Sequence, residues 1–99
     1  MYREVIKTGG LAVVTGAANG VGKAAAQRFV QDGLGVVLVD LAGEALDRAE
    51  AELRDLAGAT AIVQAVPTDV TETDAMIASA DQVFALGEVA VLMNNAGIA

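Results

Sequence analysis

The sequence reads L-A-V-V-T-G-A-A-N-G-V-G from Leu11 to Gly22. Four apolar residues at its start predict a short strand buried on both faces. Glycines follow at positions 16, 20 and 22, and the pattern becomes helical from Gly22 onward. A strand that runs through a glycine-rich turn into a helix gathers backbone N–H groups at the positive end of the helix dipole. The stretch therefore predicts a phosphate-binding turn at the carboxyl edge of a sheet.

Position gives each of the three glycines a different expected role. Gly16 lets the chain leave the strand sharply, Gly20 lets the backbone approach a pyrophosphate, and Gly22 lets the helix pack closely on the sheet. The spacing G-x-x-x-G-x-G is not that of a P-loop, which also needs Ser or Thr where Ala24 stands, and it is not G-x-G-x-x-G. Because short glycine motifs recur by chance, the stretch alone also fits an ordinary strand-to-helix turn.

Composition restricts the classes of protein to consider. The 99 residues suffice for one domain, and the net charge of -7 disfavours nucleic acid and anionic membranes as partners. Without Cys or His, the chain has no thiolate or imidazole metal ligands, no disulfides and no Ser-His-Asp triad. The longest uncharged stretch, residues 8–22, is too short to span a membrane, and residues 1–10 do not resemble a signal peptide. We expect a cytoplasmic protein with no metal site.

Strand and helix patterns alternate along the chain. Valine-rich apolar runs predict strands, whereas apolar residues at a spacing of three and four predict helices that end at glycines. Thr71, with Asp74 three residues later, is expected to form a capping box. The expected elements are strands over 11–14, 35–40, 60–66 and 89–93, and helices over 22–32, 42–57 and from 71 to about 86.

Each predicted helix has an expected apolar face. Strands separated by such helices favour parallel pairing with right-handed crossovers, and hence a doubly wound α/β sheet with ligands bound beyond the carboxyl ends of its strands. The expected core positions of the helices are Val21, Ala25 and Phe29 in the first, Leu46, Ala49, Leu53 and Leu56 in the second, and Met76, Ile77, Ala80, Val83 and Phe84 in the third.

Polar residues stand where the second, third and fourth strands end. Asp40 lies 18 residues after Gly22, near the spacing expected of an acid that accepts hydrogen bonds from ribose hydroxyls and repels a 2'-phosphate. No basic residue stands at Asn19 or Leu41, which also favours NAD over NADP. Asp69-Val70 is placed to meet an adenine ring, although an Asp before a helix is commonly a turn or cap residue. Residues 94–97, Asn-Asn-Ala-Gly, are compatible with a cofactor contact or a simple turn.

Together these motifs resemble the N-terminal part of the classical short-chain dehydrogenase/reductase family. The signature Thr-Gly-x-x-x-Gly-x-Gly corresponds to residues 15–22 and Asn-Asn-Ala-Gly to residues 94–97, with Val21 replacing the more usual isoleucine. The resemblance implies a Rossmann-type sheet of strand order 3-2-1-4 over residues 11–99, after a lead-in over residues 1–10. It implies cofactor contacts at Gly16, Asn19, Gly20, Val21, Gly22, Asp40, Asp69, Val70, Asn95, Ala96 and Gly97.

The same resemblance implies hydride transfer between NAD and an alcohol or carbonyl substrate. In that family a tyrosine, assisted by a lysine four residues later, acts as the general acid or base. The single tyrosine, Tyr2, is followed four residues later by Ile6. We therefore expect no catalytic residue within these 99 residues and no turnover by the chain alone. A non-catalytic NAD-binding module and an inert fragment are the alternatives, and we expect homo-oligomers or association through the exposed fourth strand.

Overall fold

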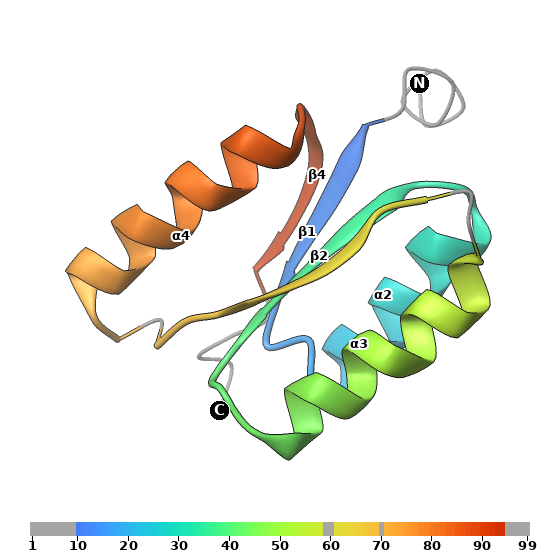
Figure 1. Ribbon diagram of the computed structural model, residues 1–99, viewed down its shortest axis with the longest axis horizontal. Helices are drawn as coiled ribbons and strands as arrows, with labels where there is room; N and C mark the ends of the chain where they lie inside the picture. The colour runs from blue at the N-terminus through green and yellow to red at the C-terminus, as the bar shows by residue number, and fades with distance from the viewer. Residues whose placement is uncertain (1–9, 59–60, 70, 95–99) are drawn as a thin grey trace.

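The computed structural model describes residues 10–58, 61–69 and 71–94. In the described residues, parallel strands form a four-stranded sheet of order β3-β2-β1-β4 (Figure 1). The predicted α/β doubly wound fold and its strand order are therefore confirmed. The elements are β1 Leu11–Thr15, α2 Gly20–Gln31, β2 Gly35–Asp40, α3 Glu44–Ala57, β3 Val63–Pro67, α4 Thr73–Leu86 and β4 Val89–Asn94.

Helices cover the two faces of the sheet unequally. α2 and α3 lie side by side on one face, and α4 lies on the other (Figure 1). This follows from right-handed crossovers, because the chain moves outward from β1 to β3 over one face and returns to β4 over the opposite face. The cluster under α2 and α3 includes the fully buried Leu34, Leu38, Leu46 and Leu53. The cluster under α4 is built mainly of valines.

The central strands are buried along their length, as their apolar runs predict. All five residues of β1 are buried, and β2 is buried at its four inner positions. A strand between two others and between two helical layers has no solvent face, so alternation of apolar and polar residues is not required.

The end of α2 agrees with the prediction, whereas its start and its buried face differ. Gly33, with φ of 93°, ends the helix: its N–H donates to the carbonyl of Val30, and the Leu34 N–H donates to that of Phe29. The helix begins at Gly20, two residues earlier than predicted. Its buried residues are Gly22, Ala26 and Val30, each one position after a predicted core residue. Of the predicted face, Phe29 is partly buried against the core, whereas Val21 is exposed.

α3 and β3, unlike α2, begin later than predicted. α3 starts at Glu44 after Gly43, and it buries the expected Leu46, Ala49 and Leu53 but leaves Leu56 exposed. β3 starts at Val63 and includes Pro67, which was predicted to stop it. Proline fits there because β3 is an edge strand, where an outward N–H is not needed for pairing.

The predicted capping box of α4 is wrong. The N-cap residue is Glu72, and no side chain caps this end. Thr71 instead turns back: its N–H and hydroxyl both donate to Asp69 Oδ1, at 2.9 and 2.6 Å. Of the expected apolar face Val83 is buried, whereas Met76, Ile77, Ala80 and Phe84 are exposed.

Two further expectations concern the N-terminal lead-in and membrane-spanning helices. Of the predicted lead-in, only Gly10 belongs to the described residues, where it is buried. No helix among residues 10–58, 61–69 and 71–94 has the length and apolar character to cross a lipid bilayer.

Candidate functional site

The carboxyl ends of β1 and β2 meet at the turn between β1 and α2. Gly16 and Gly20 there have φ of 64° and 61°, in the region that favours glycine. A Cβ added to Gly20 would find no atom within 4 Å, so the backbone conformation, not crowding within the chain, requires glycine at this position. The open space beside Gly20 leaves its backbone accessible to a ligand. Gly22 is buried in the first turn of α2.

The first turn of α2 begins at this open space. The N-cap residue, Asn19, is extended and its side chain accepts no hydrogen bond from the helix. The first hydrogen bond of the helix, from the Lys23 N–H to the Asn19 carbonyl, measures 3.4 Å. The N–H groups of Gly20, Val21 and Gly22 precede that bond, where a helix attracts anions. Val21 is 68% exposed beside them.

The Asp40 carboxylate faces the glycine turn. Its Oδ2 accepts a hydrogen bond from the Ala18 N–H at 2.9 Å, and its Oδ1 accepts one from the Leu41 N–H at 2.8 Å. These two bonds fix the carboxylate beside the first turn of α2, while each oxygen keeps acceptor capacity for a further donor. The sequence pattern predicted Asp40 at this edge. It did not predict the contact with Ala18, because the donor is a backbone N–H that any residue at position 18 would supply.

Asp69 lies at the same edge, one strand further out. The Thr68 N–H donates to the Asp40 carbonyl at 2.7 Å, so the pairing of β2 and β3 continues to the residue before Asp69. Thr71 holds Asp69 Oδ1 through the two bonds described above. The Thr71 hydroxyl and then its N–H hold the pKa of the Asp69 carboxyl below its ordinary value, and burial opposes them. Asp69 is thus kept ionised and in a turn.

The end of β4 is joined to the end of β1. The Thr15 hydroxyl donates to the side-chain oxygen of Asn94 at 3.0 Å. Thr15 and Asn94 belong to the two quoted motifs, and the predicted strand order placed their strands side by side, but neither residue was predicted as a cofactor contact. Four predicted cofactor contacts, at Val70, Asn95, Ala96 and Gly97, lie outside the described residues.

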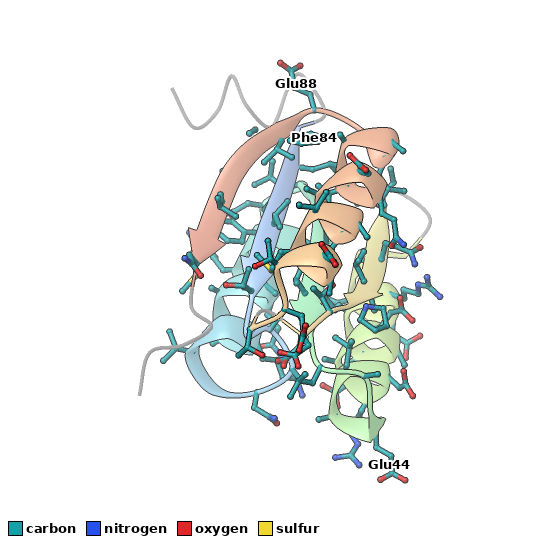
Figure 2. All side chains as sticks on the ribbon, turned by 90° about the vertical axis from the view of Figure 1, so that its left-hand side faces the viewer. Glu44, Phe84 and Glu88 are labelled. Atoms are coloured by element: carbon teal, nitrogen blue, oxygen red, sulfur yellow. The ribbon has the colours of Figure 1, made fainter. Side chains whose placement is uncertain are left out.

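A separate, apolar cavity lies between α4 and the sheet, on the face seen in Figure 2. Its volume is about 220 Å³. Thr15 and Ser79 are its polar lining residues, so its chemistry differs from that of the glycine turn. The remaining lining residues are Val13, Val39, Met76, Ala80, Val83, Phe84, Val89 and Leu92.

Comparison with known proteins gives a consistent result. The family model described as short chain dehydrogenase matches residues 10–99. A 1-deoxy-11-beta-hydroxypentalenate dehydrogenase of Streptomyces exfoliatus is 46% identical over 88 residues, which are 88% of this chain and 31% of the relative. A galactitol 2-dehydrogenase (L-tagatose-forming) of Cereibacter sphaeroides is 38% identical over 99 residues, 99% of this chain and 37% of the relative.

Solved structures agree with these matches. An NAD+-bound xylitol dehydrogenase superimposes with a TM-score of 0.82 at 36% identity, covering 90% of this chain and 34% of that protein. A metagenomic short-chain oxidoreductase in complex with NADP gives a TM-score of 0.81 at 37% identity, covering 91% and 40%. The chain thus spans about a third of the length of the relatives it matches. By its fold, its motifs and the family model, this chain belongs to the short-chain dehydrogenase family.

Proposed function

We propose that the protein is an NAD-dependent oxidoreductase and that these residues hold the adenosine half of the dinucleotide. The observation that carries the proposal is the Asp40 carboxylate, held against the glycine turn by the Ala18 N–H at 2.9 Å. A diphosphate at the first turn of α2 would leave its adenosine ribose next to this carboxylate. The carboxylate would then accept hydrogen bonds from both ribose hydroxyls.

The preference for NAD over NADP rests on charge. A 2'-phosphate would lie next to the Asp40 carboxylate, and the two negative charges would repel each other. Asn19 and Leu41, the flanking positions from which a basic side chain could compensate, are uncharged and exposed. Asp69 adds a second negative charge to the same edge, and its Oδ2 is proposed to accept a hydrogen bond from the adenine amino group.

The reaction of the whole protein is proposed to be hydride transfer between NAD and an alcohol or carbonyl. The relatives named above are dehydrogenases, and an NAD+-bound xylitol dehydrogenase shares the fold. The 99 residues alone are proposed to bind without turnover, since Tyr2 lacks a lysine four residues later. We further propose a cytoplasmic location and, for the 99 residues by themselves, homo-oligomers or association through β4, an edge strand of the described sheet.

Titration of NAD and NADP into the chain, followed by calorimetry, tests the cofactor assignment. Asp40→Asn removes the charge and keeps one oxygen that can accept the Ala18 N–H, at the loss of the bond from the Leu41 N–H. We expect NAD binding to weaken by about tenfold or more, as for loss of hydrogen bonds to a charged group, and the preference for NAD to shrink. Asp55→Asn, at the far end of α3, is the matched control and should change neither affinity.

An unchanged ratio of NAD to NADP affinity in Asp40→Asn would refute the role of Asp40. Turnover of NAD with an alcohol by the 99-residue chain would refute its proposed inactivity. Failure to bind either dinucleotide would leave an inert fragment as the better description of these residues.

A further inference from the structure

β3 forms one edge of the described sheet and lies next to α3 (Figure 1). An edge strand normally presents a row of N–H and C=O groups that can pair with a strand of another chain. Exposed rows of this kind lead to aggregation unless something occupies or removes them. Whether the outward backbone groups of β3 are paired or free therefore decides whether another chain can add a strand at this edge.

Alternation of the backbone shows which groups of β3 point outward. The Ile62 carbonyl accepts the Val36 N–H, and the Thr68 N–H donates to the Asp40 carbonyl, so both residues direct their backbone toward β2. Backbone groups in a parallel pair alternate between the two sides of a strand. Val63, Ala65 and Pro67 thus direct theirs to the outside.

Side chains occupy these outward groups in succession. The Val63 carbonyl accepts a hydrogen bond from Arg54 Nε at 3.0 Å, and the Ala65 N–H donates to Glu50 Oε2 at 2.5 Å. The Ala65 carbonyl accepts one from Gln64 Nε2 at 3.0 Å. Pro67 has no N–H. From the carbonyl of Val63 to the nitrogen of Pro67, each outward group is occupied or missing.

The two residues from α3 also hold each other. Arg54 Nη2 lies 3.3 Å from Glu50 Oε2, and the two are one helical turn apart. The Glu50 side chain is 21% exposed, so its bond to the Ala65 N–H is partly shielded from water. An ion pair between residues one turn apart on a helix contributes little to stability by itself. Its contacts with β3 suggest a different role for the pair.

We propose that Glu50, Arg54 and Gln64 close the outer edge of β3, together with Pro67, against a strand of a second copy of this chain. The sheet consequently ends at β3, and intermolecular strand pairing is suppressed on this side. The proposal is independent of the cofactor, because none of these four residues belongs to the candidate site.

A single introduced cysteine reports on pairing at this edge, since the sequence contains no cysteine. Ala65→Cys places a thiol at the centre of β3, where an antiparallel pair of two copies would bring identical residues opposite each other. Under mild oxidation we expect this chain to remain largely monomeric. Adding Glu50→Ala and Arg54→Ala should raise the disulfide-linked dimer about tenfold, the factor for one charge-assisted hydrogen bond.

Arg48→Ala with Asp55→Ala is the matched control, because it removes one base and one acid from exposed positions of the same helix. Equal dimer fractions with and without Glu50 and Arg54 would overturn the proposal, and so would an equal rise in the control. Should the double variant fail to fold, Pro67→Ala alone restores an outward N–H. It should raise the dimer about threefold, and no rise would count against the proposal.

Amide hydrogen exchange provides a local readout in the monomer. Glu50→Ala should accelerate exchange of the Ala65 N–H by about tenfold while leaving that of Val37, inside the sheet, unchanged. Acceleration at both amides would indicate general loosening and would contradict a local role for Glu50.

Discussion

The two faces of the sheet differ in how completely they are covered. Under α2 and α3, Leu34, Leu38, Leu46 and Leu53 are fully buried and pack in one cluster. Under α4 the sheet borders a cavity, and Phe84 on that helix is 69% exposed (Figure 2). The difference teaches that the described residues complete the face that supports the glycine turn and leave the opposite face open.

The difference follows from the number of helices on each face and from their sequences. α2 and α3 together span β1, β2 and β3, whereas α4 alone covers the other side. α4 is apolar over much of its surface, since Met76 and Ile77 are also exposed. Truncating an apolar side chain should therefore lower the free energy of unfolding by different amounts on the two faces.

The largest expected effect is the contrast between Leu38→Ala and Phe84→Ala. Leu38 is fully buried, so its truncation should lower the free energy of unfolding by about 2–5 kcal/mol. Phe84 is mostly exposed, and its truncation should change that free energy by less than about 0.5 kcal/mol. Urea unfolding of both variants measures the difference. Equal losses would show that the α4 face is as closed as the other.

The next effect tests whether the α4 face is loose throughout. Gly35 and Leu11 are the first residues of β2 and β1, and Leu11 belongs to the cluster under α4. A Cβ on Gly35 would lie 2.6 Å from Leu11 Cδ2, and Leu11 is only 2% exposed. Gly35→Ala should cost about 1–3 kcal/mol through overpacking. Combining it with Leu11→Val, which removes Cδ2, should recover part of this cost in urea unfolding. Strict additivity of the two substitutions would contradict the tight contact.

The smallest effect concerns the turn that leads from β3 into α4. Thr71→Val removes the hydroxyl bonded to Asp69 Oδ1 and should raise the pKa of Asp69 toward its ordinary value, whereas Thr71→Ser should keep it low. Because the folded pKa is depressed, this contact stabilises the fold above the ordinary pKa of the carboxyl and is lost as the pH falls through the lowered pKa. The chemical shift of the Asp69 carboxyl carbon, followed by NMR as a function of pH, measures this pKa. An unchanged pKa in Thr71→Val would assign the shift to the backbone bond alone.

Much of the fold could be predicted from the sequence, because valine-rich runs and glycine ends are local signals. The boundaries of α2 and the face it buries could not. Small residues, Gly22 and Ala26, pack closest to the sheet, and a search for large apolar residues selects their neighbours instead. The same reasoning placed Phe84 in a core, although burial of an apolar helix depends on what the rest of the fold brings to it.

The site was predictable in its outline and not in its connections. Spacing after the glycine turn identified Asp40, since parallel strands bring their carboxyl ends to one edge. The bonds from Ala18 to Asp40 and from Thr15 to Asn94 join residues distant in the sequence. Thr71 was misassigned because both a helix cap and a turn on Asp69 use a hydroxyl at this spacing.

An NMR titration of the uniformly ¹⁵N-labelled chain with NAD tests the central claim most directly. The diphosphate and ribose are proposed to bind between the first turn of α2 and Asp40. The account predicts that the largest shift changes occur at the amides of Ala18, Gly20, Val21 and Leu41, with little change at Val83. Largest changes along α4, or no change at saturating NAD, would contradict it.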